Sequence, residues 1–205
     1  MAVTTIATLP PAKVSEARER LLATATQIFY AEGINTVGVD RIVSDASVTR
    51  ATFYRHFPSK QDLVLAYLQK VHDAIEERHV ALVAAHEPPD VLKALGEDIA
   101  AQLERPGFRG CAFINAASEF EDGDGPIRQA VAAHRAWFLG VVRDAFVAAG
   151  HGSPGPAAEH FVMLRDGAMV GGHLGDAAVA AETFRRGVDG LLRSGDGRFG
   201  ERRSA

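Results

Sequence analysis

The sequence predicts an all-α protein of about nine helices. Apolar residues recur at the i, i+3 and i+4 spacing of one helical face in several long segments. Capping residues precede these segments, and glycine or proline follows them, as is usual at helix ends. Of the 205 residues, 47% are hydrophobic and 23% are charged, which is ordinary for a globular protein and argues against disorder. This length suffices for one large or two small domains.

The first helix is predicted to begin after Ser15, its expected N-cap, and to end at Gly33. Before it, the segment Met1–Lys13 has no periodicity and is expected to be a flexible arm. The helix is expected to support the two helices that follow. Its predicted buried stripe consists of Leu21, Leu22, Ala25, Ile28 and Phe29.

Two short helices joined by a tight turn are predicted within Val39–Lys60. Thr49 is a good N-cap for the second, and Pro58 stops it because proline cannot continue a helix. Ser59 and Asp62 then form a capping box that begins a long helix, expected to end near Ala85. The apolar residues that should anchor the pair are Val39, Ile42, Val43, Ala46, Phe53 and Phe57.

The exposed side chains of the second short helix suit a nucleic acid. Hydroxyl and guanidinium groups at its N-terminal end are placed to read base edges in a major groove. Aromatic hydroxyl, imidazole and ammonium groups suit phosphate oxygens. A short amphipathic helix pair with a merely solvated polar face is the alternative, because this geometry also occurs in proteins that do not bind DNA. The predicted DNA-binding residues are Thr36, Thr49, Arg50, Thr52, Tyr54, Arg55, His56 and Lys60.

The run TRATFYRHFPSKQDL, from Thr49 to Leu63, resembles the DNA-binding segment of the TetR family of transcriptional repressors. A weaker likeness, RGCAFINAASEF from Arg109 to Phe120, is to the ligand domain of one subgroup. The resemblance implies a three-helix helix-turn-helix DNA-binding domain at residues 13–60. Through the helix 59–85, it would be linked to a helical ligand-binding and dimerisation domain at residues 61–195. Gly38 and Ser47 depart from the family pattern, and Ser47 would be strained if its φ angle is positive.

The rest of the chain is predicted to be helical. Asp90 should cap one helix, Cys111–Phe120 should form a short helix, and Pro126 should begin a central helix that ends at Gly150. Two final helices are expected at Ala157–His173 and Ala177–Arg193. They are rich in glycine and alanine, which favours close helix packing.

The resemblance implies a homodimer through helices 157–173 and 177–193. The apolar area for this interface is expected from Phe161, Leu164, Val170, Phe184, Val188, Leu191 and Leu192. It also implies a small-molecule effector in an apolar cavity with a few polar groups. The candidate ligand-binding residues are Phe113, Glu119, His134, Trp137, Phe138 and Met163, although any one such residue is more often plain core than a ligand contact.

Several other patterns are weak. The acidic turn Glu121–Gly125 lacks the twelve-residue loop of an EF-hand, so no calcium or other metal is expected. The segments Gly150–Gly155 and Gly195–Gly200 match G-x-G-x-x-G, but neither follows a predicted strand, so no dinucleotide cofactor is expected. The lone Cys111 excludes a disulfide within the chain and favours a cytoplasmic location. A redox role for this thiol stays open.

Charge divides unevenly along the chain. Residues 1–70 hold eight Lys and Arg against six Asp and Glu, whereas residues 71–205 hold fourteen against twenty. The mild positive charge therefore accompanies the candidate DNA-binding segment. The expected function is a ligand-responsive DNA-binding regulator, most simply a repressor released from a double-stranded operator. A helical adaptor and a small helical enzyme are the alternatives, although no catalytic motif is present; neither a membrane span nor a signal peptide is expected.

Overall fold

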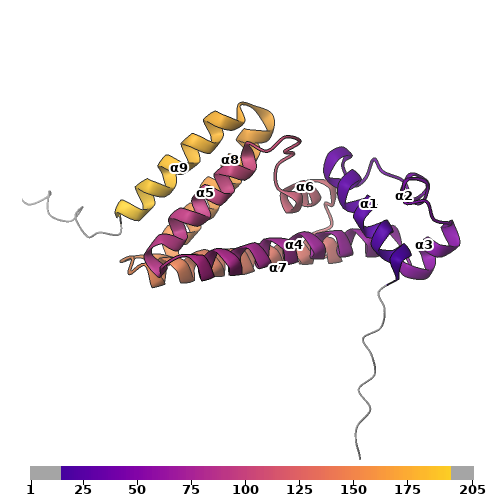
Figure 1. Ribbon diagram of the computed structural model, residues 1–205, viewed down its shortest axis with the longest axis horizontal. Helices are drawn as coiled ribbons and strands as arrows, with labels where there is room; N and C mark the ends of the chain where they lie inside the picture. The colour runs from indigo at the N-terminus through magenta and orange to yellow at the C-terminus, as the bar shows by residue number, and fades with distance from the viewer. Residues whose placement is uncertain (1–14, 195–205) are drawn as a thin grey trace, which may run out of the picture.

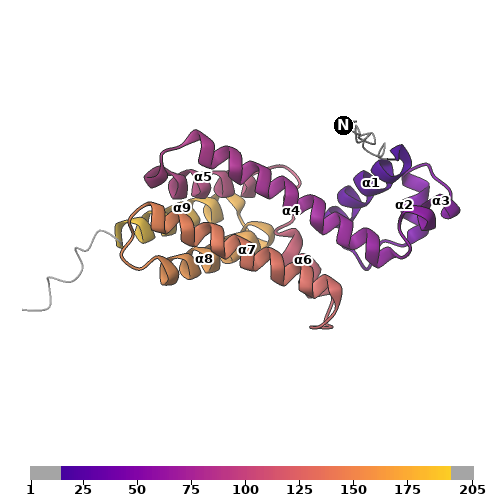
Figure 2. The ribbon, with the colours of Figure 1, turned by 90° about the horizontal axis from the view of Figure 1, so that it is seen from below.

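The computed structural model describes residues 15–194, which contain nine α-helices, one 3-10 turn and no strand. The predicted all-α fold class is confirmed. The first three helices form a compact unit at one end of an elongated molecule, and the long α4 runs from this unit into a bundle (Figures 1 and 2). The helices are α1 Glu16–Glu32, α2 Val39–Asp45, α3 Arg50–His56, α4 Lys60–Ala85, α5 Val91–Leu103, α6 Ala112–Glu119, α7 Pro126–Ala148, α8 Pro154–Leu174 and α9 Ala177–Ser194, with the 3-10 turn at Pro88–Asp90.

The N-terminal unit has its own apolar core, made by α1, α2, α3 and the start of α4. Phe53 and Phe57, the predicted anchors of α3, are both buried, and Phe29 packs edge-on against Tyr67 of α4. The predicted capping box of α4 is present, since Ser59 and Asp62 bond each other's backbone N–H. Ser15 stands at the N-cap position of α1, but its hydroxyl makes no capping bond.

Ser47 occupies the turn between α2 and α3 with a φ angle of +52°. The N–H of Val48 donates to the carbonyl of Val43 at 3.0 Å, which places Ser47 at the left-handed position of a Schellman motif. Glycine is favoured there because it lacks the Cβ that crowds the neighbouring carbonyl. The strain expected from the sequence is therefore present.

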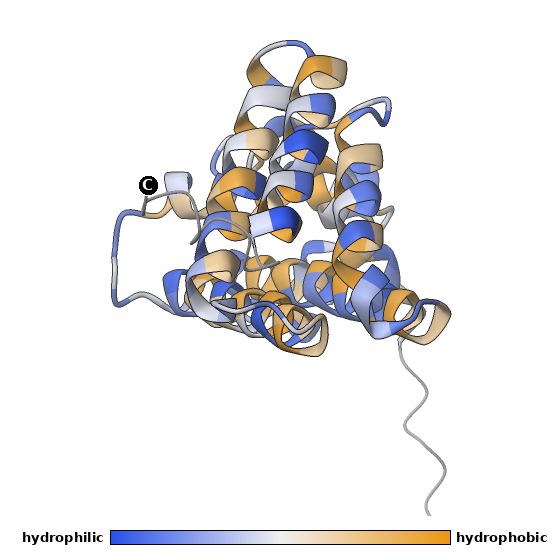
Figure 3. Ribbon diagram, turned by 90° about the vertical axis from the view of Figure 1, so that its left-hand side faces the viewer, coloured by the Kyte–Doolittle hydropathy of each residue, from blue (hydrophilic) through white to orange (hydrophobic). Residues whose placement is uncertain are grey.

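The C-terminal bundle is built on α5, α7, α8 and α9, and the short α6 lies beside α7 near the N-terminal unit (Figure 2). Along its helices, hydrophilic and hydrophobic residues alternate, so that each helix turns one face to a shared core (Figure 3). That core includes Leu92, Leu103, Val142, Phe146 and Phe161, all almost fully buried. Within the part of the chain that the structure describes, no helix is long and apolar enough to cross a membrane.

The last two helices correct one prediction. Phe161, Phe184 and Val188, expected to supply a dimer interface, are at most 3% exposed because they pack inside the chain. Of that predicted set, Val170 is the one exposed side chain, at 44%. The predicted arm at Met1–Lys13 and the glycine pattern at Gly195–Gly200 lie outside the described residues.

Candidate functional site

The outer face of α3 carries several exposed polar side chains. Thr49 caps the helix, accepting the N–H of Thr52 at 3.1 Å, and the two threonine hydroxyls lie 2.9 Å apart. Tyr54 is 49% exposed even though its ring also packs edge-on against Phe53. Arg55 on the same helix is exposed. Because Phe53 and Phe57 fix the opposite face in the core, these groups are presented on a rigid support.

Arg50 is held by a neighbouring helix. Its Nε and Nη2 atoms contact the two carboxylate oxygens of Asp40 on α2, at 2.9 and 3.1 Å. Both side chains are largely exposed, and such surface pairs contribute about 1 kcal/mol or less. The pair orients the guanidinium without preventing its exchange onto another anion.

Three other predicted DNA-binding side chains already have partners within the chain. The hydroxyl of Thr36 donates to the carbonyl of Glu32 at 2.7 Å, and His56 Nε2 lies 3.1 Å from the hydroxyl of Ser15. Lys60 Nζ donates to the carbonyl of Ile34 at 2.6 Å. Burial lowers the pKa of Lys60, and the nearby Glu119 carboxylate partly offsets that effect. The structure thus gives Lys60 a role in holding the α1–α2 turn, in place of the free ammonium that the sequence suggested.

Glu119 ties α6 to the same turn. Its two carboxylate oxygens accept the backbone N–H groups of Ile34 at 2.9 Å and of Asn35 at 2.6 Å, and its carbonyl accepts the side-chain amide of Asn35 at 2.8 Å. This Glu119 contact joins the N-terminal unit to the C-terminal bundle across about 85 positions of sequence. This contact differs from the ligand-binding role predicted for Glu119, because both carboxylate oxygens accept backbone N–H groups of the turn.

A second tie between the two parts of the molecule involves Tyr30 of α1. Its hydroxyl donates to the carbonyl of Gly110 at 3.0 Å and accepts the N–H of Arg109 at 2.9 Å. Burial raises the pKa of Tyr30, although the hydrogen bond from Arg109 opposes that shift. Tyr30 and the Glu119 contact therefore fix α1 against the segment that leads into α6 and against the end of α6.

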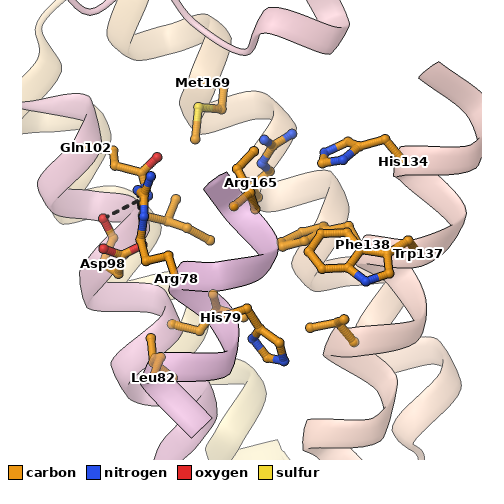
Figure 4. Close-up of a pocket in the computed structure, with 14 residues that line it drawn as sticks. Arg78, His79, Leu82, Asp98, Gln102, His134, Trp137, Phe138, Arg165 and Met169 are labelled. Carbon is orange, nitrogen blue, oxygen red and sulfur yellow. Dashed lines mark hydrogen bonds and ion pairs between the residues drawn. The ribbon is translucent and has the colours of Figure 1, made fainter. Parts of the chain in front are cut away.

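Between these ties lies a cavity of about 400 Å³, called here the outer cavity. Residues from α1, α4, α6, α8 and the loop after α5 line it, which places it where the N-terminal unit meets the bundle. An inner chamber adjoins it, and the two spaces share five lining residues: Ile75, Arg78, Gln102, Arg165 and Met169. The last four are labelled in Figure 4. The size is within the range of small-molecule sites, at the lower end.

Arg165 of α8 lies where the two spaces meet. It is 9% exposed, and its guanidinium donates to Asp166 at 2.9 Å and to the Cys111 sulfur at 3.3 Å. Burial lowers the pKa of Arg165, but its contacts with Cys111 and Asp166 outweigh burial, so the pKa is raised overall. The protein therefore keeps a fixed positive charge at this buried position.

The predicted ligand-binding aromatics gather around the inner chamber. His134, Trp137 and Phe138 line it (Figure 4), and Phe113 of the outer cavity stacks on His134 with ring centroids 3.6 Å apart. His134 Nδ1 lies 3.0 Å from His72 Nδ1, so one of these nitrogens must donate to the other. Burial, followed by the charge of Arg165, lowers the pKa of His134 to about 3.

Met163 lies elsewhere, on the outside of α8, where it is 71% exposed and lines neither space. Sequence reasoning missed Arg165, Tyr30 and Phe108 as cavity residues. An arginine at an apolar-face position of α8 was the available signal, because a buried charge needs partners and usually has a function. Among residues 15–194, no group of three or more His, Cys, Asp and Glu side chains is arranged to hold a metal ion.

These features define a helix-turn-helix protein with a helical second domain that contains a cavity. Residues 21–67 match the family described as bacterial regulatory proteins, tetR family, and residues 88–188 match the tetracyclin repressor-like C-terminal domain. The crystal structure of SCO4454, a TetR-family transcriptional regulator from Streptomyces coelicolor, is 48% identical, with a TM-score of 0.85 over 88% of this chain and 96% of that one. The chain belongs to the TetR family of transcriptional regulators.

Curated relatives match over part of the chain. The HTH-type transcriptional repressor BepR of Brucella suis is 34% identical over 94 residues, which are 45% of this chain and 44% of that protein. The HTH-type transcriptional activator FasR of Mycolicibacterium smegmatis is 40% identical over 55 residues, or 27% of this chain and 25% of that protein. The chain thus spans less than half the length of these two relatives.

Proposed function

We propose that this protein is a homodimeric, DNA-binding transcriptional repressor that a small molecule releases from its operator. The observation that carries the proposal is the exposed polar face of α3, held rigid by its buried aromatic residues at one end of the molecule. We assign the DNA-binding domain to residues 13–60 and the ligand-binding and dimerisation domain to residues 61–195, with α4 as the link.

On this proposal, α3 enters the major groove. Thr49, Arg50 and Thr52 at its N-terminal end face base edges, while Tyr54 and Arg55 meet phosphates. Arg50 exchanges its pairing with Asp40 for a base or a phosphate when DNA binds. Thr36, His56 and Lys60 are secondary candidates, since their polar groups have internal partners.

The outer surface of α8 supports the homodimer. Met163, Val170 and Leu174 are 71%, 44% and 78% exposed, and their spacing of seven and four places them on one helical face. A Cβ added at Gly167, on the same face, would meet nothing within 4 Å. Val179 of α9 is also exposed and apolar. A two-fold axis through this surface gives the pair of α3 helices that a symmetric operator requires, about 34–36 Å apart.

Release by a ligand follows from the position of the outer cavity. Tyr30 of the N-terminal unit and Phe113 of α6 both line it, and α6 also carries Glu119. A ligand that fits the cavity better in one orientation of the N-terminal unit shifts the population toward that orientation. Its effect is limited to the difference between its affinities for the two states.

Selection of bound sequences from random duplex DNA tests the proposal. We expect an inverted repeat whose half-sites are one helical turn apart, and a log affinity that falls steeply with log salt. Arg55→Ala should weaken binding to specific and random duplexes alike and make the salt slope about one unit shallower. The matched variant Lys93→Ala removes an exposed cation of α5 and should leave both unchanged. No enrichment of any sequence, with no salt-dependent binding, would contradict the proposal.

A further inference from the structure

The charges around the outer cavity point to the chemical class of its ligand. We infer that the effector is an amphipathic anion, a carboxylate on an extended apolar body. This inference rests on the proposed function, because it names the ligand that would cause release. The cavity residues that carry it are Lys70, Arg78, Arg105 and Arg165.

The cavity has an excess of positive charge. Four cationic side chains line it, whereas none of its described lining residues is Asp or Glu. Arg78 and Arg165 are balanced from outside the cavity by Asp98 at 3.7 Å and Asp166 at 2.9 Å. Within residues 15–194, neither Lys70 nor Arg105 has a carboxylate within ion-pair distance, and both are exposed. The excess positive charge therefore comes from Lys70 and Arg105, which are open to solvent.

Arg165 supplies a buried donor behind them. A guanidinium has five N–H groups, and within the described chain Arg165 makes two hydrogen bonds. One of these goes to the Cys111 sulfur, which is a weak acceptor. The protein therefore provides few acceptors for the N–H groups of Arg165, and a ligand carboxylate oxygen that reaches them would accept a hydrogen bond. Hydrogen bonds between charged groups are stronger than those between neutral groups.

The remaining walls suit a hydrocarbon or aryl body. They are largely apolar and aromatic, and they include Tyr67, which is 2% exposed, and Tyr30, whose hydroxyl is already bonded to Gly110 and Arg109. A neutral molecule of this shape would leave Lys70 and Arg105 without an anionic partner, and a cation would be repelled by them. The apolar lining residues include Val71, Ile75, Phe108, Phe113 and Met169.

Three probes with the same ten-carbon chain test the inference: decanoate, 1-decanol and decylammonium. Calorimetry of the full chain without DNA measures binding directly, and fluorescence of the single tryptophan, Trp137 in the adjoining chamber, gives a second readout. We expect decanoate to bind about tenfold or more tighter than either other probe, the effect of one hydrogen bond to a charged group. Equal binding of decanoate and decylammonium, or no binding of decanoate, would overturn the inference.

Variants locate the site. The double variant Lys70→Gln with Arg105→Gln changes exposed residues, so it should fold, and it should remove most of the preference for decanoate over decanol. Arg165→Met should also remove most of the preference for decanoate over decanol, provided that this variant folds. The double variant at Lys70 and Arg105 decides the test without it. Lys93→Gln with Arg143→Gln is the matched control, because it removes two exposed cations outside the cavity. An equal loss of preference in both double variants would overturn the inference.

The two proposals fail separately. Calorimetry contains no DNA, and the selection from random duplexes contains no ligand. A protein that selects an operator but binds all three probes alike would retain the proposed function and lose the anionic effector. A protein that binds decanoate through Lys70 and Arg105 but selects no DNA would retain the anionic ligand and lose the proposed function.

Discussion

Replacing Glu119 should loosen the α1–α2 turn without disturbing either core. The carboxylate accepts the N–H groups of Ile34 and Asn35 and belongs to the half-buried surface between the two parts of the molecule. In Glu119→Gln, the remaining side-chain oxygen can still accept one backbone N–H. The new NH2 group is a donor, so it cannot accept the other backbone N–H, and that hydrogen bond is lost. In Glu119→Ala, both acceptors are lost.

The magnitude follows from these two bonds. A hydrogen bond to a charged group contributes about 1.5–3 kcal/mol, and partial exposure favours the lower end because water can replace the acceptor. Loss of one bond should then raise the local opening equilibrium about tenfold, and loss of both about a hundredfold. Unfolding of the bundle core should change far less, since no core side chain is altered.

Native-state hydrogen exchange measures this opening amide by amide. Ile34 and Asn35 should exchange faster in Glu119→Gln and faster still in Glu119→Ala. Glu121→Gln changes an exposed carboxyl two positions away and serves as the control. If these two amides exchange in Glu119→Ala at the wild-type rate, the carboxylate does not hold the turn and the proposed coupling through α6 is refuted.

The remaining predictions concern strain, titration and assembly. Ser47→Gly should raise the free energy of unfolding by about 1 kcal/mol in urea denaturation, because φ is +52° there; a lower midpoint would contradict this reading. His134 has its pKa lowered from 6.5 to about 3, so between those values the unfolded state binds a proton that the folded state excludes, and stability falls as pH falls. At pH 5 the loss should be about 2 kcal/mol relative to neutral pH. His134→Phe should lack this part of the decline, and an equally steep pH profile in that variant would argue against the assignment. Met163→Glu with Leu174→Glu should give a folded monomer in sedimentation, while Val147→Glu, on an exposed site of α7, should leave a dimer; a double variant that remains dimeric would place the interface elsewhere.

Local patterns were enough to predict most of the architecture. The cap at Thr49, the capping box at Ser59 and the proline at the start of α7 are all found as expected. The buried anchors Phe53 and Phe57 also follow from helical spacing. These features were predictable because capping bonds and helical faces depend on residues within about four positions of one another.

The functions of individual polar side chains were less predictable. Lys60 and His56 suit phosphates by residue type, yet they bond partners 26 and 41 positions away. Met163 suits an apolar cavity, but it lies on the outer face of α8. Residue type states what a group is able to bond, whereas the packing of distant helices decides which partner is within reach.

The sequence by itself therefore determined the helices, their buried faces and the exposed polar face of α3, because each depends on short-range chemistry. Only the tertiary structure decided that Glu119 holds the turn after α1 and that Arg165 lies beside Cys111. Both depend on contacts between residues more than 50 positions apart. A buried charge or a carboxylate takes its role from the groups that folding brings to it, and spacing along the chain does not encode them.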